Sequence, residues 1–143
     1  MHVRDDPATV ADALHSAAIH VLRRASAVDP ESGLTPARLS ALSVVVFAGP
    51  LTVGELAAAE QVRSPTMTSL VNGLEAAGLV ARQPAPDDGR SVLVVATPRG
   101  SRVLQRARAR RVAELTERLA GLPARVLATL RRAATLMERV AAS

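Results

Sequence analysis

The chain has 143 residues, enough for one ordinary domain or a domain with helical extensions. Its 48% apolar and 22% charged residues are typical of a globular protein, and the absence of cysteine excludes disulfides, thiolate zinc clusters and cysteine nucleophiles. All 18 basic residues are arginine against 13 acidic residues, a net charge of +5, and the single aromatic residue, Phe47, argues against stacking platforms for RNA or single-stranded DNA.

The first two predicted elements are helices over about 7–26 and 36–48. Asp6 before Pro7, and Thr35 before Pro36, are typical N-cap and first-turn pairs, and apolar residues follow each at helical spacing. The segment 29–33 between the two helices is a predicted loop. The second helix is expected to stop before Gly49 and Pro50.

Two shorter helices follow. Thr52 and Glu55 match a capping box that opens the third helix, and Ser64 before Pro65 is predicted to cap the fourth. The apolar stripe of the fourth helix is expected to pack inward, and Gly78 is its natural stop.

The remainder of the chain predicts a hairpin and two more helices. Residues 79–83 and 91–96 are rich in β-branched side chains and predict two strands around a loop over 84–90. Thr97 before Pro98 is expected to cap a helix to about 120, residues 121–123 to break it, and a last helix to run nearly to the end.

Two short capped helices followed directly by a β-hairpin indicate a winged helix-turn-helix. The outward face of the fourth helix is expected to carry Thr66, Thr68, Ser69, Asn72 and Gly73. These are small, mostly hydrogen-bonding residues that suit a major groove, where Asn reads adenine edges and Ser or Thr contact bases or phosphates. A merely solvated helix face is the alternative interpretation.

Charge is concentrated in the same region. Residues 1–60 carry a net −3, residues 61–111 a net +6 and residues 112–143 a net +2. Such a local excess is typical of a phosphate-binding face, although arginines that only solvate helix faces give the same count. Arg90 beside Gly89 in the hairpin loop suits a narrow minor groove.

These segments resemble the MarR family of bacterial transcription regulators. The resemblance lies in residues 74–82, in 87–94 and in 97–100, where Asp88, Arg90 and Thr97 match the family's wing signature. It extends over essentially the whole chain, because the length and helix order agree as well. Relatives often carry a basic residue at the position of Ser69, and this chain does not.

The resemblance implies a mainly α fold with a small β-hairpin wing, in which a winged helix-turn-helix is flanked by N- and C-terminal dimerisation helices. It divides the chain into 1–34, 35–97 and 98–143, with the recognition helix at 64–77 and the wing at 84–91. The expected function is a homodimeric regulator, more often a repressor, that binds double-stranded DNA at a pseudo-palindromic operator. The expected DNA-binding residues are Arg63, Ser64, Pro65, Thr66, Thr68, Ser69, Asn72, Arg82, Asp88 and Arg90.

Dimerisation is also indicated by the C-terminal third. From Leu115 to Val140 apolar residues recur every three or four positions, too long a stripe for a small domain to bury unaided. An intramolecular helical hairpin is the alternative. By resemblance, a small apolar or weakly acidic effector would bind between the dimer helices and the DNA-binding part, near His15, Arg23, Leu42 and Val46.

Two other function classes remain open. Six arginines between Arg99 and Arg111 would allow a basic helix that binds a membrane or a protein, although such helices usually show a bulky aromatic face. Enzyme activity is not expected, because His15 and His20 form no pair and no nucleophile elbow, phosphate loop, metal spacing or cofactor motif is present. With no targeting signal expected in the opening residues, a cytoplasmic location is predicted.

Overall fold

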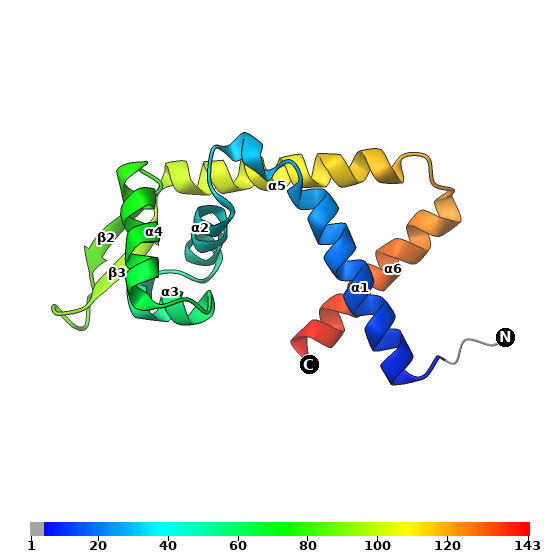
Figure 1. Cartoon of the computed structure of the whole chain (residues 1–143), viewed down its shortest axis with the longest axis horizontal. Coiled ribbons are helices and arrows are strands. Elements are labelled where there is room, and N and C mark those ends of the chain that lie inside the picture. The colour runs from blue at the N-terminus through cyan, green and yellow to red at the C-terminus, as the bar shows by residue number, and fades with distance from the viewer. Residues whose placement is uncertain (1–4) are drawn as a thin grey trace. The chain divides into compact units, whose positions relative to one another are not determined.

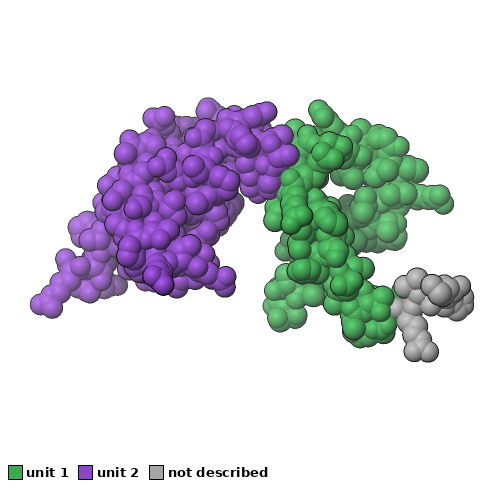
Figure 2. Space-filling view, in the orientation of Figure 1, with its two compact units in different colours: residues 1–25, 112–143 green, residues 26–111 purple. Residues whose placement is uncertain are grey.

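The computed structural model describes residues 5–143, so the opening residues, in which no targeting signal is expected, lie partly outside it. Two compact units make up the chain, Ser26–Arg111 and the combination of Met1–Ala25 with Val112–Ser143 (Figure 2).

The fold is mainly helical with a small antiparallel sheet, which confirms the predicted fold class (Figure 1). Its helices are α1 (Pro7–Ser26), the 3-10 turn η1 (Asp29–Ser32), α2 (Pro36–Ala48), α3 (Val53–Ala59), α4 (Ser64–Ala76), α5 (Pro98–Leu119) and α6 (Ala124–Ala142). Its strands are β1 (Leu51–Thr52), β2 (Val80–Pro84) and β3 (Val92–Ala96).

Four of the predicted N-caps, Asp6, Thr35, Thr52 and Thr97, are confirmed by hydrogen bonds. The Asp6 carboxylate accepts bonds from the backbone of residues 8 and 9 and from the Thr9 hydroxyl, which lowers the pKa of Asp6. Thr35 and Thr52 accept from the backbone N–H groups three residues later. The predicted Ser64 cap is wrong, because the first helical bond of α4 runs from Met67 N–H to the carbonyl of Arg63 and so places the N-cap one residue earlier.

The sheet has the strand order β1-β3-β2, and its first strand was not expected from the sequence. Leu51 and Thr52 pair with Val94 and Leu93, while β2 pairs with β3 from Val80↔Ala96 to Pro84↔Val92. Two residues are too few to show an alternating pattern, so β1 has no signature of its own.

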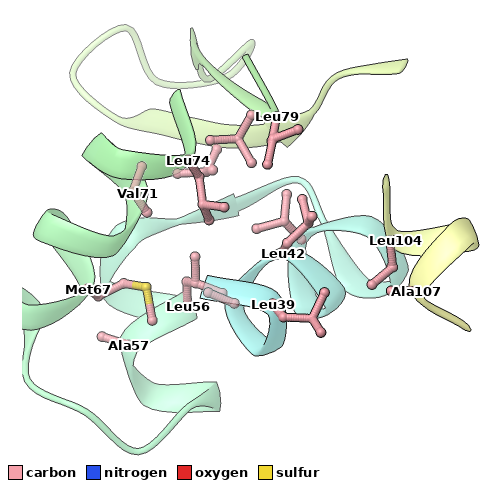
Figure 3. Close-up of a cluster of buried hydrophobic side chains, with 14 residues drawn as sticks. Leu39, Leu42, Leu56, Ala57, Met67, Val71, Leu74, Leu79, Leu104 and Ala107 are labelled. Carbon is pink, nitrogen blue, oxygen red and sulfur yellow. The ribbon is translucent and has the colours of Figure 1, made fainter. Parts of the chain in front are cut away.

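A single apolar core lies between α2, α3, α4, the sheet and the first half of α5 (Figure 3). Of the stripe predicted for α4, Met67, Val71 and Leu74 are fully buried and Leu70 is half-buried, whereas Ala77, the C-cap residue, is exposed. Leu42 of α2 and Leu56 of α3 face them, and Leu104 and Ala107 add the contribution of α5. Packing therefore fixes which face of α4 is left outside.

The C-terminal end of α4 is joined to the start of α5. Gly78, at φ +74°, closes α4 with bonds from Gly78 N–H to the Glu75 carbonyl and from Leu79 N–H to the Leu74 carbonyl, a Schellman arrangement. The Thr97 hydroxyl donates to the Gly78 carbonyl at 2.6 Å and accepts from Gly100 N–H at 3.0 Å. One side chain thus caps α5 and ties its start to the glycine that follows α4.

The turn η1 is held to α5 by two ion pairs. Arg111 forms a two-pronged pair with the Asp29 carboxylate at 2.7 and 2.6 Å, which raises the pKa of the Arg111 guanidinium. Arg110 lies 3.4 Å from Glu31. Two of the seven α5 arginines are therefore held in ion pairs with η1.

The other unit exposes much of its apolar surface. No residue of α6 is buried, and in α1 only Ala25 is. Large apolar side chains stand open along both helices and the end of α5, at Val10, Val21, Leu22, Val112, Leu119, Leu122, Leu127, Leu130, Leu136, Met137 and Val140.

The close approach at Gly100 generates a prediction about stability. A Cβ at Gly100 would collide with the carbonyl of Leu79 and meet a Leu42 methyl group at 3.3 Å. We expect Gly100→Ala to lower the free energy of unfolding by about 1–3 kcal/mol, although alanine favours a helix. Urea unfolding at fixed protein concentration measures the change.

Gly121→Ala is the matched control for this substitution. Nothing lies within 4 Å of the Cβ position at Gly121, so the same added methyl group meets open space there. Equal midpoints and slopes for the two variants would contradict the close packing of α5 on the end of α4.

Candidate nucleic-acid interface

The outward face of α4 carries the predicted polar side chains. Thr66, Thr68, Ser69 and Asn72 are all exposed, as are Ser64 and Pro65 at the helix start. The Thr68 hydroxyl donates to the Ser64 carbonyl at 2.9 Å, so it presents its methyl group and lone pairs outward. The face thus offers methyl groups, hydroxyls and one amide, which are the groups that read base edges in a major groove.

Gly73 does not belong to this open face, contrary to the prediction. It is half-buried because the Arg38 guanidinium of α2 lies over it, and a Cβ at Gly73 would meet that guanidinium at 2.7–2.9 Å. None of the 13 residues of α4 is basic, so Arg38 brings a positive charge onto this helix. An isolated glycine inside a helical pattern was the one sequence signal of such a contact.

Arg82 of β2 reaches back to α4 and bridges two of its side chains. Its Nη1 lies 2.6 Å from Glu75 Oε1, and its Nη2 donates to Asn72 Oδ1 at 2.7 Å. The Arg82 side chain is 27% exposed. Two residues of the predicted site are therefore in direct contact, and Glu75, which the sequence did not single out, holds one of them.

The wing is shaped by Asp88. Its carboxylate accepts from the backbone N–H of Arg90 and from the Ser91 hydroxyl, each at 3.0 Å, and these two bonds lower the pKa of Asp88. Its carbonyl accepts from Ser91 N–H at 3.1 Å. Asp88 thus folds the loop, and the exposed Arg90 side chain stands beside it.

Arg63 and Arg90 mark the two ends of the candidate surface. Both are exposed, and neither forms an ion pair within residues 5–143. Unpaired guanidinium groups at a helix start and at a loop tip are available to phosphates or to a minor groove.

The four predicted effector residues lie in different surroundings. His15 and Arg23 are exposed on α1. Leu42 is fully buried in the core of residues 26–111, and Val46 is half-buried and packs against that core. A ligand would reach Leu42 only by displacing core side chains.

The described residues contain neither a candidate membrane span nor a candidate metal site. Over residues 5–143 no helix combines the length and the apolar character that crossing a membrane requires. Across the same range, no group of three or more His, Asp or Glu side chains is arranged to hold a metal ion.

Comparison with known proteins adds an independent line of evidence. Residues 32–91 match the MarR family. An uncharacterized HTH-type transcriptional regulator of Mycobacterium bovis is 38% identical over 133 residues, which is 93% of each chain. A transcriptional regulator of Thermotoga maritima is 29% identical with a TM-score of 0.79, over 94% of this chain and 97% of that one. A mutant MarR of E. coli is 25% identical with a TM-score of 0.71, over 91% and 94%.

The bonds of Asp88 predict how the wing responds to substitution. We expect Asp88→Ala to increase backbone motion over residues 87–91, because two bonds that fix the loop are lost, with little change in melting temperature. NMR order parameters of the wing amides measure this. Asp87→Ala is the control, since it removes a neighbouring carboxylate that makes no hydrogen bond in the structure.

The same bonds give the wing a pH dependence. Because the pKa of Asp88 is lowered in the folded chain, the stabilisation is fully present above the ordinary value of 3.8 and is lost as the pH falls below it through the lowered pKa. Wing order parameters that stay constant across this range in the unsubstituted protein would show that the carboxylate does not fix the loop.

Proposed function

This chain belongs to the MarR family, and we propose that it is a homodimeric repressor that binds a pseudo-palindromic operator in double-stranded DNA. The observation that carries the proposal is the exposed face of α4, which has small hydrogen-bonding side chains and no basic residue, while its one acidic residue, Glu75, is paired with Arg82. In the proposed complex, α4 enters the major groove of the DNA and the wing lies against the adjacent DNA backbone or minor groove.

The positive charge that attracts DNA lies around α4 rather than on it. Arg63 precedes the helix, Arg38 lies over Gly73, and Arg90 stands on the wing. Contacts from such residues supply the affinity that depends on salt, whereas the polar side chains of α4 supply the preference for sequence. The proposed division of roles assigns base contacts to Thr66, Thr68, Ser69 and Asn72.

The exposed apolar residues of α1, α5 and α6 support the homodimer. Leu130, Leu136 and Val140 of α6 are 44%, 56% and 64% exposed, and no residue of this helix is buried in the single chain. An intramolecular helical hairpin would require packing within one chain to cover the C-terminal apolar stripe. The stripe is not covered in the single chain. A second copy offers the same apolar stripe and so is a matching partner.

The proposed assembly predicts a symmetric footprint. We expect a dimer in solution and protection of two half-sites about one helical turn, ~34–36 Å, apart. Size-exclusion chromatography with light scattering and hydroxyl-radical footprinting on selected duplexes measure these two properties. A monomer that binds DNA tightly, or a protected site without a dyad, would contradict the proposal.

We also propose that a small apolar or weakly acidic molecule releases the operator. The polar groups suited to an acid are the His15 imidazole and the Arg23 guanidinium, both exposed on α1. Release requires that the ligand bind more tightly to a dimer whose recognition helices no longer match the groove spacing. Ligand affinity alone changes nothing if both forms bind the ligand equally.

The proposed release of DNA by a small molecule predicts loss of the protein–DNA complex in gel-shift assays. Phenolic acids and lipophilic compounds, tested from micromolar to millimolar concentration, are expected to dissociate the complex, and Arg23→Ala is expected to weaken the response to the acids alone. Arg125→Ala, which removes an exposed arginine of α6, is the control. Release by peroxide with no response to any compound would overturn the ligand hypothesis.

A further inference from the structure

Arg82 stands between the wing and the recognition helix with both terminal nitrogens occupied. One nitrogen lies 2.6 Å from the Glu75 carboxylate and the other lies 2.7 Å from the Asn72 amide oxygen. The side chain is largely covered, whereas Arg63 and Arg90 are exposed. These surroundings differ from those expected of a side chain that reaches for a phosphate.

The contact fixes the Asn72 amide in one of its two orientations. A free asparagine amide can turn either its oxygen or its nitrogen toward a partner, so it can accept or donate. With Oδ1 held by a charged donor, the NH2 group of Asn72 is turned away from Arg82. Asn72 therefore offers donors to whatever lies against α4.

Glu75 in turn holds Arg82. Their ion pair spans the turn that ends α4, with Glu75 in the helix and Arg82 in β2. The carboxylate offsets the guanidinium charge, so Arg82 adds little net charge to the surface. The salt dependence of DNA binding reports how many phosphates the protein neutralises. We therefore expect this dependence to change little when Arg82 is removed.

We infer that Arg82 is a positioning residue for sequence recognition, holding Asn72 so that it donates to a base with an acceptor on its major-groove edge and rejects cytosine there. This inference rests on the proposed function. Guanine, adenine and thymine each present such an acceptor, whereas cytosine presents its N4 amino group, a donor.

Duplexes selected from a randomised pool by the unsubstituted protein provide the test. Each base pair of the selected site is changed in turn, and Asn72→Ala identifies the position that Asn72 reads. In the unsubstituted protein, we expect cytosine at that position to lower the affinity for the duplex about tenfold, which is the cytosine penalty. In Arg82→Ala, we expect cytosine there to leave the affinity nearly unchanged. We expect Arg82→Lys to lose the penalty as well, because a single ammonium nitrogen lacks the planar pair of terminal nitrogens that holds Glu75 and Asn72 separately.

Salt dependence separates positioning from a phosphate contact. We expect Arg82→Ala to keep the slope of log affinity against log salt, and Arg90→Ala, the control, to reduce it by about one and to weaken all duplexes alike. A reduced slope with an intact cytosine penalty in Arg82→Ala would overturn the inference. An unchanged penalty in Arg82→Lys would overturn it as well.

The double variant tests whether Arg82 acts through Asn72. In the Asn72→Ala background, Arg82→Ala should not change base preference further, and a further change would contradict the inference. If Arg82→Ala does not fold, Glu75→Gln and Arg82→Lys carry the test, with loss of the cytosine penalty expected in both. If the unsubstituted protein selects no preferred sequence from the randomised pool, the proposed function is refuted instead.

Discussion

The Thr97 hydroxyl joins the end of α4 to the start of α5, and the surface around α4 depends on it. It accepts from the N–H of Gly100, which caps the start of α5, and donates to the carbonyl of Gly78, the residue that follows the C-cap of α4, so one side chain links the two segments. The backbone adds a bond from Thr97 N–H to the Leu79 carbonyl. Gly100 lets the two segments approach closely enough for these bonds to form. The direction of α4 is thereby set relative to the first turn of α5.

This junction also determines where the hairpin leaves the core. β2 begins at Val80, two residues after the glycine that ends α4, and β3 ends at Ala96, just before Thr97. Both strands are therefore anchored at the same place, and Arg82 returns from β2 to the side of α4. A polar face on a helix held in this way has little freedom, which suits recognition by a few short side chains.

The sequence was sufficient for most elements that depend on local chemistry, although it placed the N-cap of α4 at Ser64, one residue too late. Helix caps at Asp6, Thr35 and Thr52, the glycine stop at residue 78 and the two longer strands are set by neighbouring residues, and all were predicted. The exposed side chains of α4 followed from its apolar stripe, apart from Gly73. What the sequence did not show depends on contacts between distant elements: the short strand β1, Arg38 over Gly73, and the bridge of Arg82 to Glu75 and Asn72.

The contact between Arg38 and Gly73 separates two properties of the proposed recognition helix, its nearby positive charge and its exposed polar side chains. Because the helix carries no basic residue and Arg38 lies over the glycine instead, the charge near α4 is encoded elsewhere in the chain. Exposed positions such as Thr66 and Ser69 can then be exchanged for other uncharged residues without altering the electrostatic attraction between protein and DNA. In a repressor of the proposed kind, gene duplicates could diverge toward new operators by changing α4 alone, while their general affinity for DNA is inherited unchanged.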